Sequence, residues 1–356
     1  MGIALRMARR GLGRVAPNPA VGAVIADEAS GEVIARGWTQ PGGRPHAETE
    51  AIRRAGARTR GATMYVTLEP CSHQGQTGPC ASAIIAAGLK RVVVAIEDPD
   101  TRVAGRGLAM LREAGIDVAT GVRADEARLL TLGHILRVTQ HRPFVQLKLA
   151  LAADGSVPRG GEGQATWVTS PEARAHGALL RAQADAILVG ARTVVDDDPQ
   201  LTCRLPGLAD RSPVRVAVSA TLNVPLTAKM FASARDVPTW VVCSDRVPGE
   251  KVEAFTRLGV QVVQVPPAGE SGVAVPALVS ALAGRGITRL LVEGGPRTWR
   301  AFSEAGIVDE VVVYQARGEE SDATRAAATF INLDGFSLTA EQRLARDDVA
   351  VFRARR

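Results

Sequence analysis

The sequence predicts an α/β protein of two domains, and three observations lead to this prediction. Apolar runs typical of strands alternate with segments of helical composition along the chain. The length of 356 residues suffices for two domains, each with its own core. A polar stretch that ends in proline, residues 139–143, follows a long helical segment and indicates a boundary. We therefore expect one domain in residues 1–140 and a second in residues 144–356.

In the first domain, the amphipathic pattern of residues 1–10 predicts a helix at the N-terminus. Short apolar runs predict strands at 21–26, 63–68 and 91–96. Helical composition predicts helices at 47–55, 81–87, 107–114 and 124–138. Because strands alternate with helices, a mostly parallel sheet is expected.

The second domain repeats this alternation. Strands are predicted at 144–151, 186–189, 214–218, 239–242, 260–265, 289–292, 308–314 and 349–352. Helices are predicted at 171–183, 275–283 and 298–305. A mostly parallel sheet is expected here too.

Composition excludes several classes of protein. The chain is 46% hydrophobic and 22% charged, as globular proteins are. It has no apolar run as long as a membrane span, so we expect no membrane as a partner. Residues 1–10 lack the apolar core of a secretory signal, so we expect a cytoplasmic protein, with an organelle-targeting peptide as the alternative. The net charge of +6 comes without dense basic blocks, and aromatic residues make up only 4%, which argues against nucleic acid as a partner. Small phosphorylated ligands fit the arginines better, although a genome bias towards arginine would give the same positive net charge.

The strongest motif is His46-Ala47-Glu48 followed by Pro70-Cys71 and then Cys80. Zinc prefers imidazole and thiolate ligands, and three protein ligands leave its fourth position for water. Glu48, two residues after the histidine at the start of a helix, can move a proton from that water to a departing amine. A lone His-x-Glu is usually a surface or capping feature, and two cysteines in one loop can form a structural zinc pair. The combination in this order favours a catalytic zinc site, whereas Cys203 and Cys243 are expected to be buried and inert.

The loop between Cys71 and Cys80 is longer than the Cys-x-x-Cys of most nucleobase deaminases. Together with residues 17–22, 67–73, 98–99 and 103–107, it resembles the bifunctional riboflavin-biosynthesis deaminase–reductase family over residues 1–140. The resemblance implies a cytidine-deaminase-like domain that removes the ring amine of a ribosylated, phosphorylated diaminopyrimidinone. The resemblance assigns His46, Cys71 and Cys80 as the metal ligands, Glu48 as the proton shuttle and Asn18 as a contact of the pyrimidine.

In the second domain, the strand at 289–292 runs into Glu293-Gly294-Gly295-Pro296 and then a helix, which is by itself weak evidence for phosphate binding. Segments that resemble the reductase of the same family cover most of residues 144–315, namely 146–150, 154–155, 167–170, 180–182, 186–190, 193–194, 197–199, 201–204 and 293–296. The resemblance implies a dihydrofolate-reductase-like domain that uses NADPH to reduce the ribosyl group to ribityl.

Site residues of the reductase follow from the resemblance. The expected NADPH contacts are Ala150, Trp167, Thr193, Asp197, Gly295, Pro296, Arg297, Thr298, Trp299, Arg300 and Ala301. The expected substrate contacts are Arg181, Leu201, Arg204 and Glu293. Two arginines suit a phosphorylated ligand because a guanidinium binds phosphate in a bidentate manner.

The chain departs from the family pattern at several places. Gln76 stands where the family usually has Lys or Arg, so a basic group that would pair with the substrate phosphate is missing. Asp100 stands where the family usually has Asn, and a carboxylate there is expected to repel the phosphate. Ala165 replaces a substrate-binding serine, Ser219-Ala220 replaces Asp-Ser, and residues 315–320 replace a Pro-x-Leu-Leu-Gly segment. We expect the fold to be kept despite these changes, whereas the efficiency of the reductase or the identity of its substrate is expected to be more sensitive to them.

These departures keep two alternatives open beside the bifunctional enzyme. One is a diverged paralogue of another pyrimidine-derived pathway, with the reductase altered or inactive. The other is a non-catalytic RNA-binding or editing module, against which the low aromatic content and the long cysteine loop argue. The preferred interpretation expects zinc and NADPH as cofactors, a small phosphorylated pyrimidine as partner, and a homo-oligomer.

Overall fold

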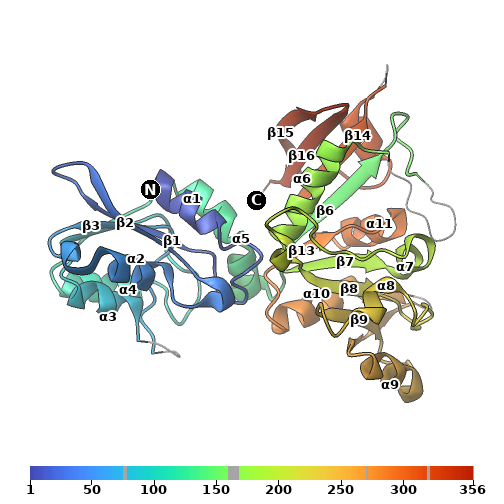
Figure 1. Cartoon of the computed structure of the whole chain (residues 1–356), viewed down its shortest axis with the longest axis horizontal. Helices are drawn as coiled ribbons and strands as arrows, with labels where there is room; N and C mark the ends of the chain where they lie inside the picture. The colour runs from blue at the N-terminus through green and yellow to red at the C-terminus, as the bar shows by residue number, and fades with distance from the viewer. Residues whose placement is uncertain (75–77, 159–167, 270–271, 319–320, 356) are drawn as a thin grey trace. The chain divides into compact units, whose positions relative to one another are not determined.

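The computed structural model describes residues 1–74, 78–158, 168–269, 272–318 and 321–355. The chain divides into two compact units, Met1–Arg142 and Pro143–Arg356 (Figure 1). Helix α5 (Ala124–Gln140) ends just before this division. Thr139 and Gln140, expected in a polar boundary, therefore belong to the last turn of that helix.

The first unit contains a five-stranded sheet with strand order β2-β1-β3-β4-β5. Its strands are β1 (Gly22–Asp27), β2 (Glu32–Trp38), β3 (Thr63–Val66), β4 (Arg91–Val94) and β5 (Asp117–Thr120). Strand β1 runs antiparallel to β2 and β3, whereas β3, β4 and β5 run parallel. The prediction of a mostly parallel sheet was wrong here, because β2 was not predicted and the short connection from β1 to β2 can only form a hairpin.

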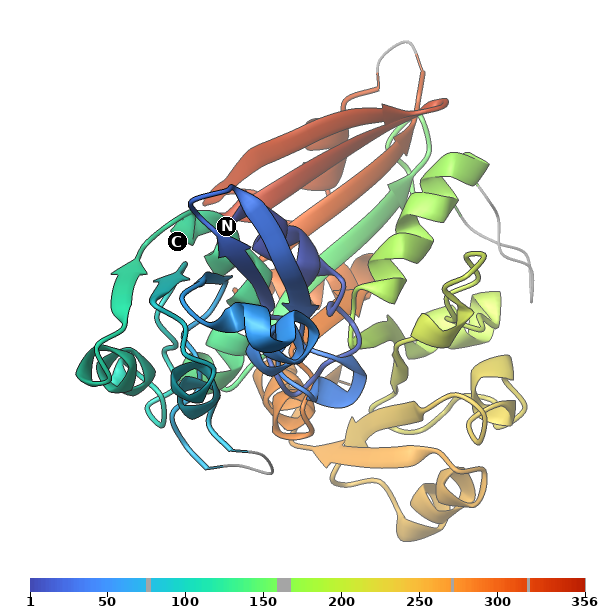
Figure 2. The ribbon, with the colours of Figure 1, turned by 60° about the vertical axis from the view of Figure 1, so that its left-hand side comes forward.

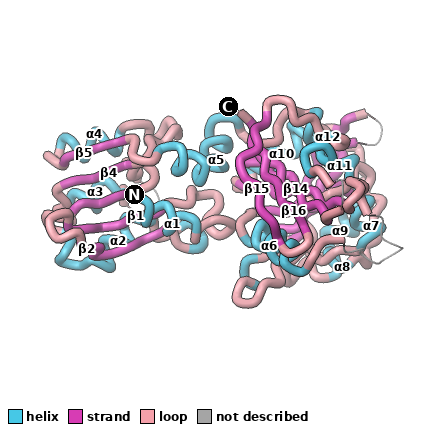
Figure 3. The backbone as a smooth tube through the Cα atoms, turned by 90° about the horizontal axis from the view of Figure 1, so that it is seen from above, coloured by secondary structure: helices cyan, strands magenta, loops and turns pink. Residues whose placement is uncertain are grey.

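Helices cover both faces of this sheet. They are α1 (Gly2–Arg9), α2 (Ala47–Ala55), α3 (Cys80–Ala86), α4 (Arg106–Glu113) and α5. Figures 1 and 3 show α1 and α5 on one face and α2, α3 and α4 on the other. The predicted helices and strands of this unit are confirmed to within two residues at each end.

The second unit is built on a nine-stranded sheet with strand order β10-β9-β8-β7-β13-β6-β14-β16-β15 (Figure 2). Its strands are β6 (Phe144–Leu151), β7 (Ala186–Gly190), β8 (Val214–Val218), β9 (Thr239–Ser244), β10 (Gln261–Val265), β13 (Arg289–Val292), β14 (Glu310–Ala316), β15 (Phe336–Leu344) and β16 (Asp347–Ala354). All neighbours from β10 to β14 are parallel, whereas β16 pairs antiparallel with both β14 and β15. The mostly parallel sheet is confirmed for this unit. A separate small ribbon joins β11 (Pro267–Ala268) and β12 (Gly272–Val273).

Two apolar clusters lie on opposite faces of the large sheet. The helices of this unit are α6 (Pro171–Ala182), α7 (Ala191–Asp197), α8 (Lys229–Ala232), α9 (Gly249–Arg257), α10 (Val275–Gly284), α11 (Pro296–Glu304) and α12 (Ala323–Ala328). Leu188 belongs to a cluster with residues of α10 and α11, while its neighbours Ile187 and Val189 belong to a cluster with residues of α7, α8 and α9. Successive side chains of a strand point to opposite faces, so the helices form two layers.

The two isolated cysteines and the start of the divergent segment lie in packed parts of the second unit. Cys203 and Cys243 are 2% and 0% exposed, as expected. Gln315 and Ala316, the first residues of the divergent segment, extend β14 and pair with Asp348 and Asp347 of β16, so the fold accommodates them. Among the described residues, no helix has both the length and the apolar character needed to cross a membrane.

Candidate active sites

His46, Cys71 and Cys80 come together although two elements separate them in the sequence. His46 is the residue before α2, Cys71 lies in the loop after β3, and Cys80 is the first residue of α3. One ligand atom of each residue lies within 4.8 Å of the other two. His46 Nδ1 is 3.3 Å from Cys80 Sγ and 3.7 Å from Cys71 Sγ. One imidazole nitrogen and two sulfurs fit zinc with an open fourth position.

The start of α3 favours the thiolate form of Cys71. The Cys80 N–H donates to Cys71 Sγ at 3.3 Å, and the Ala81 N–H donates to the Cys71 carbonyl at 3.1 Å. Hydrogen bonding from the Cys80 thiol, joined by His46, lowers the pKa of Cys71 to about 4. The thiolate is the form of cysteine that binds metals. The hydrogen bond to Cys71 and burial raise the pKa of Cys80, so of the two thiols the fold favours only Cys71 as a thiolate.

Glu48 lies in the first turn of α2, two residues after His46, and is 3% exposed. Burial raises the pKa of Glu48 to about 7, and the nearby His46 only partly offsets this. A carboxyl group that gains and loses a proton near neutral pH, beside a metal site, suits general acid–base chemistry.

A cavity of about 440 Å³ borders this cluster. Its lining includes His46, Cys71, Glu48 and Asn18, while Cys80 is buried next to His46 and Cys71 and does not line it. The structure therefore brings together all the residues expected at the deaminase site. The Asn18 amide donates to the Gly43 carbonyl at 2.9 Å, which holds the side chain in place. The volume is in the range of small-molecule sites.

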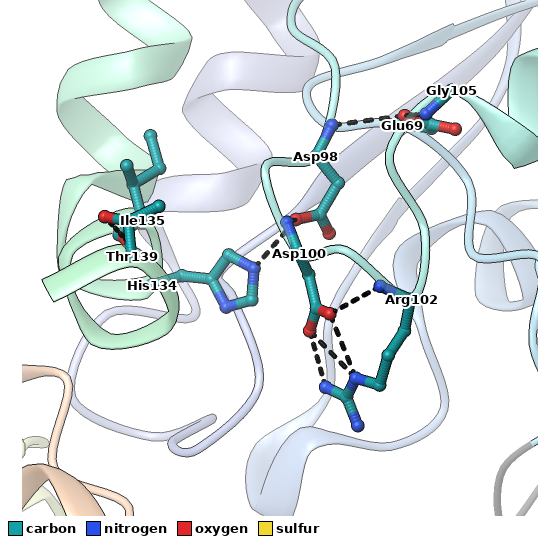
Figure 4. Close-up of polar contacts among 8 residues, drawn as sticks. All are labelled: Glu69, Asp98, Asp100, Arg102, Gly105, His134, Ile135 and Thr139. Atoms are coloured by element: carbon teal, nitrogen blue, oxygen red, sulfur yellow. Dashed lines mark hydrogen bonds and ion pairs between the residues drawn. The ribbon is translucent and has the colours of Figure 1, made fainter. Parts of the chain in front are cut away.

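Glu69 organises the wall formed by the loop after β4 (Figure 4). Its carboxylate accepts backbone N–H bonds from four residues at 2.9–3.3 Å, namely Asp98, Gly105, Gly107 and Leu108. A Cβ atom on Gly107 would lie 2.0 Å from the Pro70 carbonyl oxygen, so only glycine lets this loop approach the cysteine segment. Sequence reasoning missed Glu69 because its partners are backbone amides 29–39 residues away.

Asp100, one of the residues that differ from the family pattern, lies on the same wall of the cavity. The Asp100 carboxylate does not stand alone, because the Arg102 guanidinium bonds both of its oxygens. The expectation of simple repulsion of a phosphate was therefore incomplete. His134 and Arg137 of α5 and Arg44 also line the cavity and were missed, since no local motif shows that α5 returns to this site. Gln76 lies outside the described residues.

In the second unit, Arg181 of α6 and Glu293 form a bidentate ion pair. Arg181 Nε and Nη2 each lie 2.8 Å from one oxygen of Glu293, and Lys148 Nζ of β6 is 3.6 Å away. Burial would raise the pKa of Glu293, but Arg181 and Lys148 outweigh it and bring the pKa to about 2. Glu293 is therefore a fixed negative charge.

Neighbouring strands bring the other expected reductase residues to one edge of the sheet. Ala150 lies near the end of β6, Thr193 and Asp197 lie in α7 directly after β7, and Glu293 follows β13. Strands β7, β13 and β6 are parallel neighbours, so their carboxyl ends meet where α/β proteins bind ligands. Sequence reasoning missed Lys148 as a partner of Glu293, although its strand was predicted.

The loop after α7 reaches the same ion pair. Arg181 Nη1 donates to the Thr202 carbonyl at 3.2 Å. Leu201 is 3% exposed and has a φ of +56°, a left-handed backbone that costs about 1–2 kcal/mol for such a residue. Arg204 is exposed. Trp167 and Ala165 lie outside the described residues.

The expected cofactor turn, residues 295–301, forms the start of α11. Gly295 is the N-terminal cap residue, and no side chain caps the helix. Pro296 has no N–H and the Thr298 N–H donates to the Gly295 carbonyl at 2.9 Å, so the dipole of the helix start, more than a row of free N–H groups, makes this turn fit the phosphates of NADPH. Arg297 and Arg300 are exposed, whereas Trp299 is 3% exposed and packs edge-on against Phe330 in the core.

The folds and the two sites define a class of protein, a zinc-dependent deaminase joined to a nucleotide-dependent reductase. Residues 1–96 match the family of the cytidine and deoxycytidylate deaminase zinc-binding region, and residues 143–316 match the RibD C-terminal domain. The chain is 41% identical to the riboflavin biosynthesis protein RibD of Aquifex aeolicus over 89% of this chain and 85% of that protein. It is 39% identical to RibD of Escherichia coli over 89% and 86% of the two chains.

Solved structures agree with the sequence comparisons. Acinetobacter baumannii RibD has a TM-score of 0.84 and 33% identity, covering 99% of this chain and 97% of its own. A Thermotoga maritima diaminohydroxyphosphoribosylaminopyrimidine deaminase/5-amino-6-(5-phosphoribosylamino)uracil reductase has a TM-score of 0.81 and 32% identity, with the same coverage. The chain belongs to the RibD family of riboflavin biosynthesis proteins. It is a zinc-dependent deaminase and an NADPH-dependent reductase, which acts on a small molecule.

Proposed function

We propose that the two units catalyse successive steps on one phosphoribosyl-aminopyrimidine. Residues 1–140 hydrolyse the ring amine of the diaminopyrimidinone, and residues 144–356 then reduce the ribosyl group to ribityl. The observation that carries the proposal is the cluster of His46, Cys71 and Cys80 within 4.8 Å, of which His46 and Cys71 line one cavity together with buried Glu48. The named activities of the Thermotoga maritima relative support this choice of substrates.

In the deaminase, each side chain has a separate task. His46, Cys71 and Cys80 hold zinc, which makes water a nucleophile near neutral pH when it is bound. Glu48 takes a proton from the attacking water and delivers it to the departing amine. Asn18, fixed by its bond to Gly43, orients the pyrimidine ring. The burial of Glu48 limits its exchange of protons with solvent.

In the reductase, NADPH supplies the hydride when it is bound. The start of α11, from Gly295 to Ala301, holds NADPH together with Ala150, Trp167, Thr193 and Asp197. Arg181, oriented by Glu293, holds the substrate with Leu201 and Arg204. The exposed Arg204 guanidinium binds the anionic end of the substrate.

The cellular setting completes the proposal. The enzyme works in the cytoplasm as a homo-oligomer on small molecules and not on nucleic acid. Sedimentation of the purified protein measures its oligomeric state. An RNA titration at several salt concentrations tests the editing-module alternative, because phosphate-driven binding weakens steeply with salt.

Two assays on the full chain test the catalytic proposal. Ammonia release from the phosphoribosyl-diaminopyrimidinone reports the first step, and NADPH oxidation at saturating deaminated substrate reports the second. Both activities are expected. Ammonia release without NADPH oxidation would favour the diverged paralogue instead, which the Ser219-Ala220 segment motivates.

A further inference from the structure

Residues 98–102 form a turn on the wall of the deaminase cavity, anchored at both sides (Figure 4). The Asp98 carboxylate oxygen Oδ1 accepts the Asp100 N–H at 2.9 Å and lies 3.1 Å from His134 Nε2 of α5. Asp98 and His134 are 6% and 7% exposed, so this connection is buried. The turn is thereby attached to α5, while Glu69 holds its backbone from the other side.

Within this turn, Asp100 holds the guanidinium of Arg102. Arg102 Nε lies 3.0 and 3.1 Å from the two Asp100 oxygens, and Nη2 lies 2.5 Å from one of them. The Arg102 N–H also donates to Asp100 at 2.9 Å. These hydrogen bonds lower the pKa of Asp100 to about 2, so the pair stays charged at neutral pH.

The Asp100–Arg102 bonds use only one edge of the planar guanidinium group. Nη1 of Arg102 takes part in none of these bonds, and the Arg102 side chain is 68% exposed while it lines the cavity. An arginine that is fixed on one side keeps donors for a second anion on the other. Meanwhile the nearby carboxylates are occupied, Asp98 by His134 and Asp100 by Arg102.

We propose that Arg102, held in place by Asp100, binds the anionic phosphate end of the aminopyrimidine substrate in the deaminase cavity. The inference rests on the proposed function, because it requires a phosphorylated substrate. Arg102 is then a residue that determines specificity, and Asp100 is a positioning residue. The same pair explains how a carboxylate can stand on this wall without repelling a phosphate.

The first experiment compares the phosphorylated substrate with its dephosphorylated nucleoside. In Arg102→Ala, KM for the phosphorylated substrate should rise on the order of tenfold, as expected for the loss of a charge-assisted hydrogen bond. The value of kcat, the zinc content and KM for the nucleoside should stay unchanged. Arg112→Ala, on the exposed side of α4 and outside the cavity lining, is the matched control and should leave every value unchanged.

A double-variant cycle tests the positioning role of Asp100. Asp100→Asn alone should raise KM for the phosphorylated substrate a few-fold, because Arg102 loses its anchor. In the Arg102→Ala background the same change should lower KM, because it removes a carboxylate left without its partner. A change of the same sign in both backgrounds would overturn the positioning role.

Binding measured without turnover separates this inference from the proposed function. Calorimetric titration of the zinc-loaded full chain with ribose 5-phosphate should show weaker binding by Arg102→Ala than by Arg112→Ala. Equal binding by both variants, or an equal rise of KM for nucleoside and phosphorylated substrate, overturns the role of Arg102. Failure of the wild-type chain to deaminate the substrate would instead reject the proposed function, and the titration would still decide the phosphate contact.

Discussion

Two buried glutamates, one in each unit, have opposite electrostatic environments. Glu48 is 3% exposed, and burial raises its pKa to about 7. The Glu293 side chain is 7% exposed, but two cations, Arg181 and Lys148, hold its pKa at about 2. Desolvation acts on both, and only the paired glutamate has charges near enough to outweigh it. The first can therefore carry a proton, whereas the second can only fix the position of its partners.

The two sites also differ in how they are assembled. The proposed metal ligands and Glu48 come from two short segments, residues 46–48 and 71–80. The described residues proposed for the reductase site come from β6, α6, α7, the loop after α7, the residue after β13 and the start of α11. A metal ion needs a few atoms around one point, while a dinucleotide makes contacts over a long surface. This difference decides how much of each site a sequence can reveal.

The largest expected effect separates the two sites completely. Cys71→Ala should lose zinc and deaminase activity, because only two protein ligands remain. Reductase activity on deaminated substrate should persist, since its residues lie in the other unit. Elemental analysis measures the zinc content, and Cys243→Ala is the matched control with zinc retained. Full zinc in Cys71→Ala would reject the ligand assignment.

The next effect tests Glu48 as a proton carrier. Glu48→Gln keeps the size of the side chain but cannot carry a proton, so kcat of deamination should fall about 10²–10⁴-fold with zinc retained. Glu50→Gln is the control on the same helix, because Glu50 pairs with Arg53 and Arg54 and does not line the cavity. Comparable kcat values for the two variants would contradict the role of Glu48.

Glu293→Gln tests the other side of the comparison. It should leave Arg181 and Lys148 without a counter-charge and lower the free energy of unfolding of the second unit by about 3 kcal/mol. Zinc content and deamination should not change. Denaturant unfolding, followed together with NADPH oxidation, measures the effect. Unchanged stability would mean that water already screens this pair.

The smallest expected effect concerns the division between the units. Residues 143–356, expressed alone, should fold and oxidise NADPH with deaminated substrate at nearly the rate of the full chain, because this unit has its own apolar clusters. Circular dichroism and the reductase assay check this. A fragment that folds but has lost activity would show that the first unit contributes to the reductase site.

Local sequence patterns determined most of the secondary structure. The apolar runs of β6, β8 and β13 matched the strands at both ends, because buried parallel strands are apolar on both faces. Strands β2, β5, β11, β12 and β15 and helices α7, α8, α9 and α12 were not predicted. Strand β15 is largely exposed, and β2 begins with Glu32 and has Arg36 and Gly37 before its last apolar residue, so neither has a continuous apolar pattern. Missing β2 also led to the wrong expectation of a mostly parallel first sheet.

The sequence by itself was enough to predict the zinc chemistry, because the proposed metal ligands and Glu48 occur in a characteristic order and spacing. Only the tertiary structure decided the surroundings of these residues. It showed that Asp100 is paired with Arg102, that His134 approaches from α5, and that Lys148 joins the Arg181–Glu293 pair. The physical reason is distance along the chain. A pKa or a charge balance depends on every group within a few ångströms, and the fold brings these groups together from positions up to 145 residues apart, as between Lys148 and Glu293.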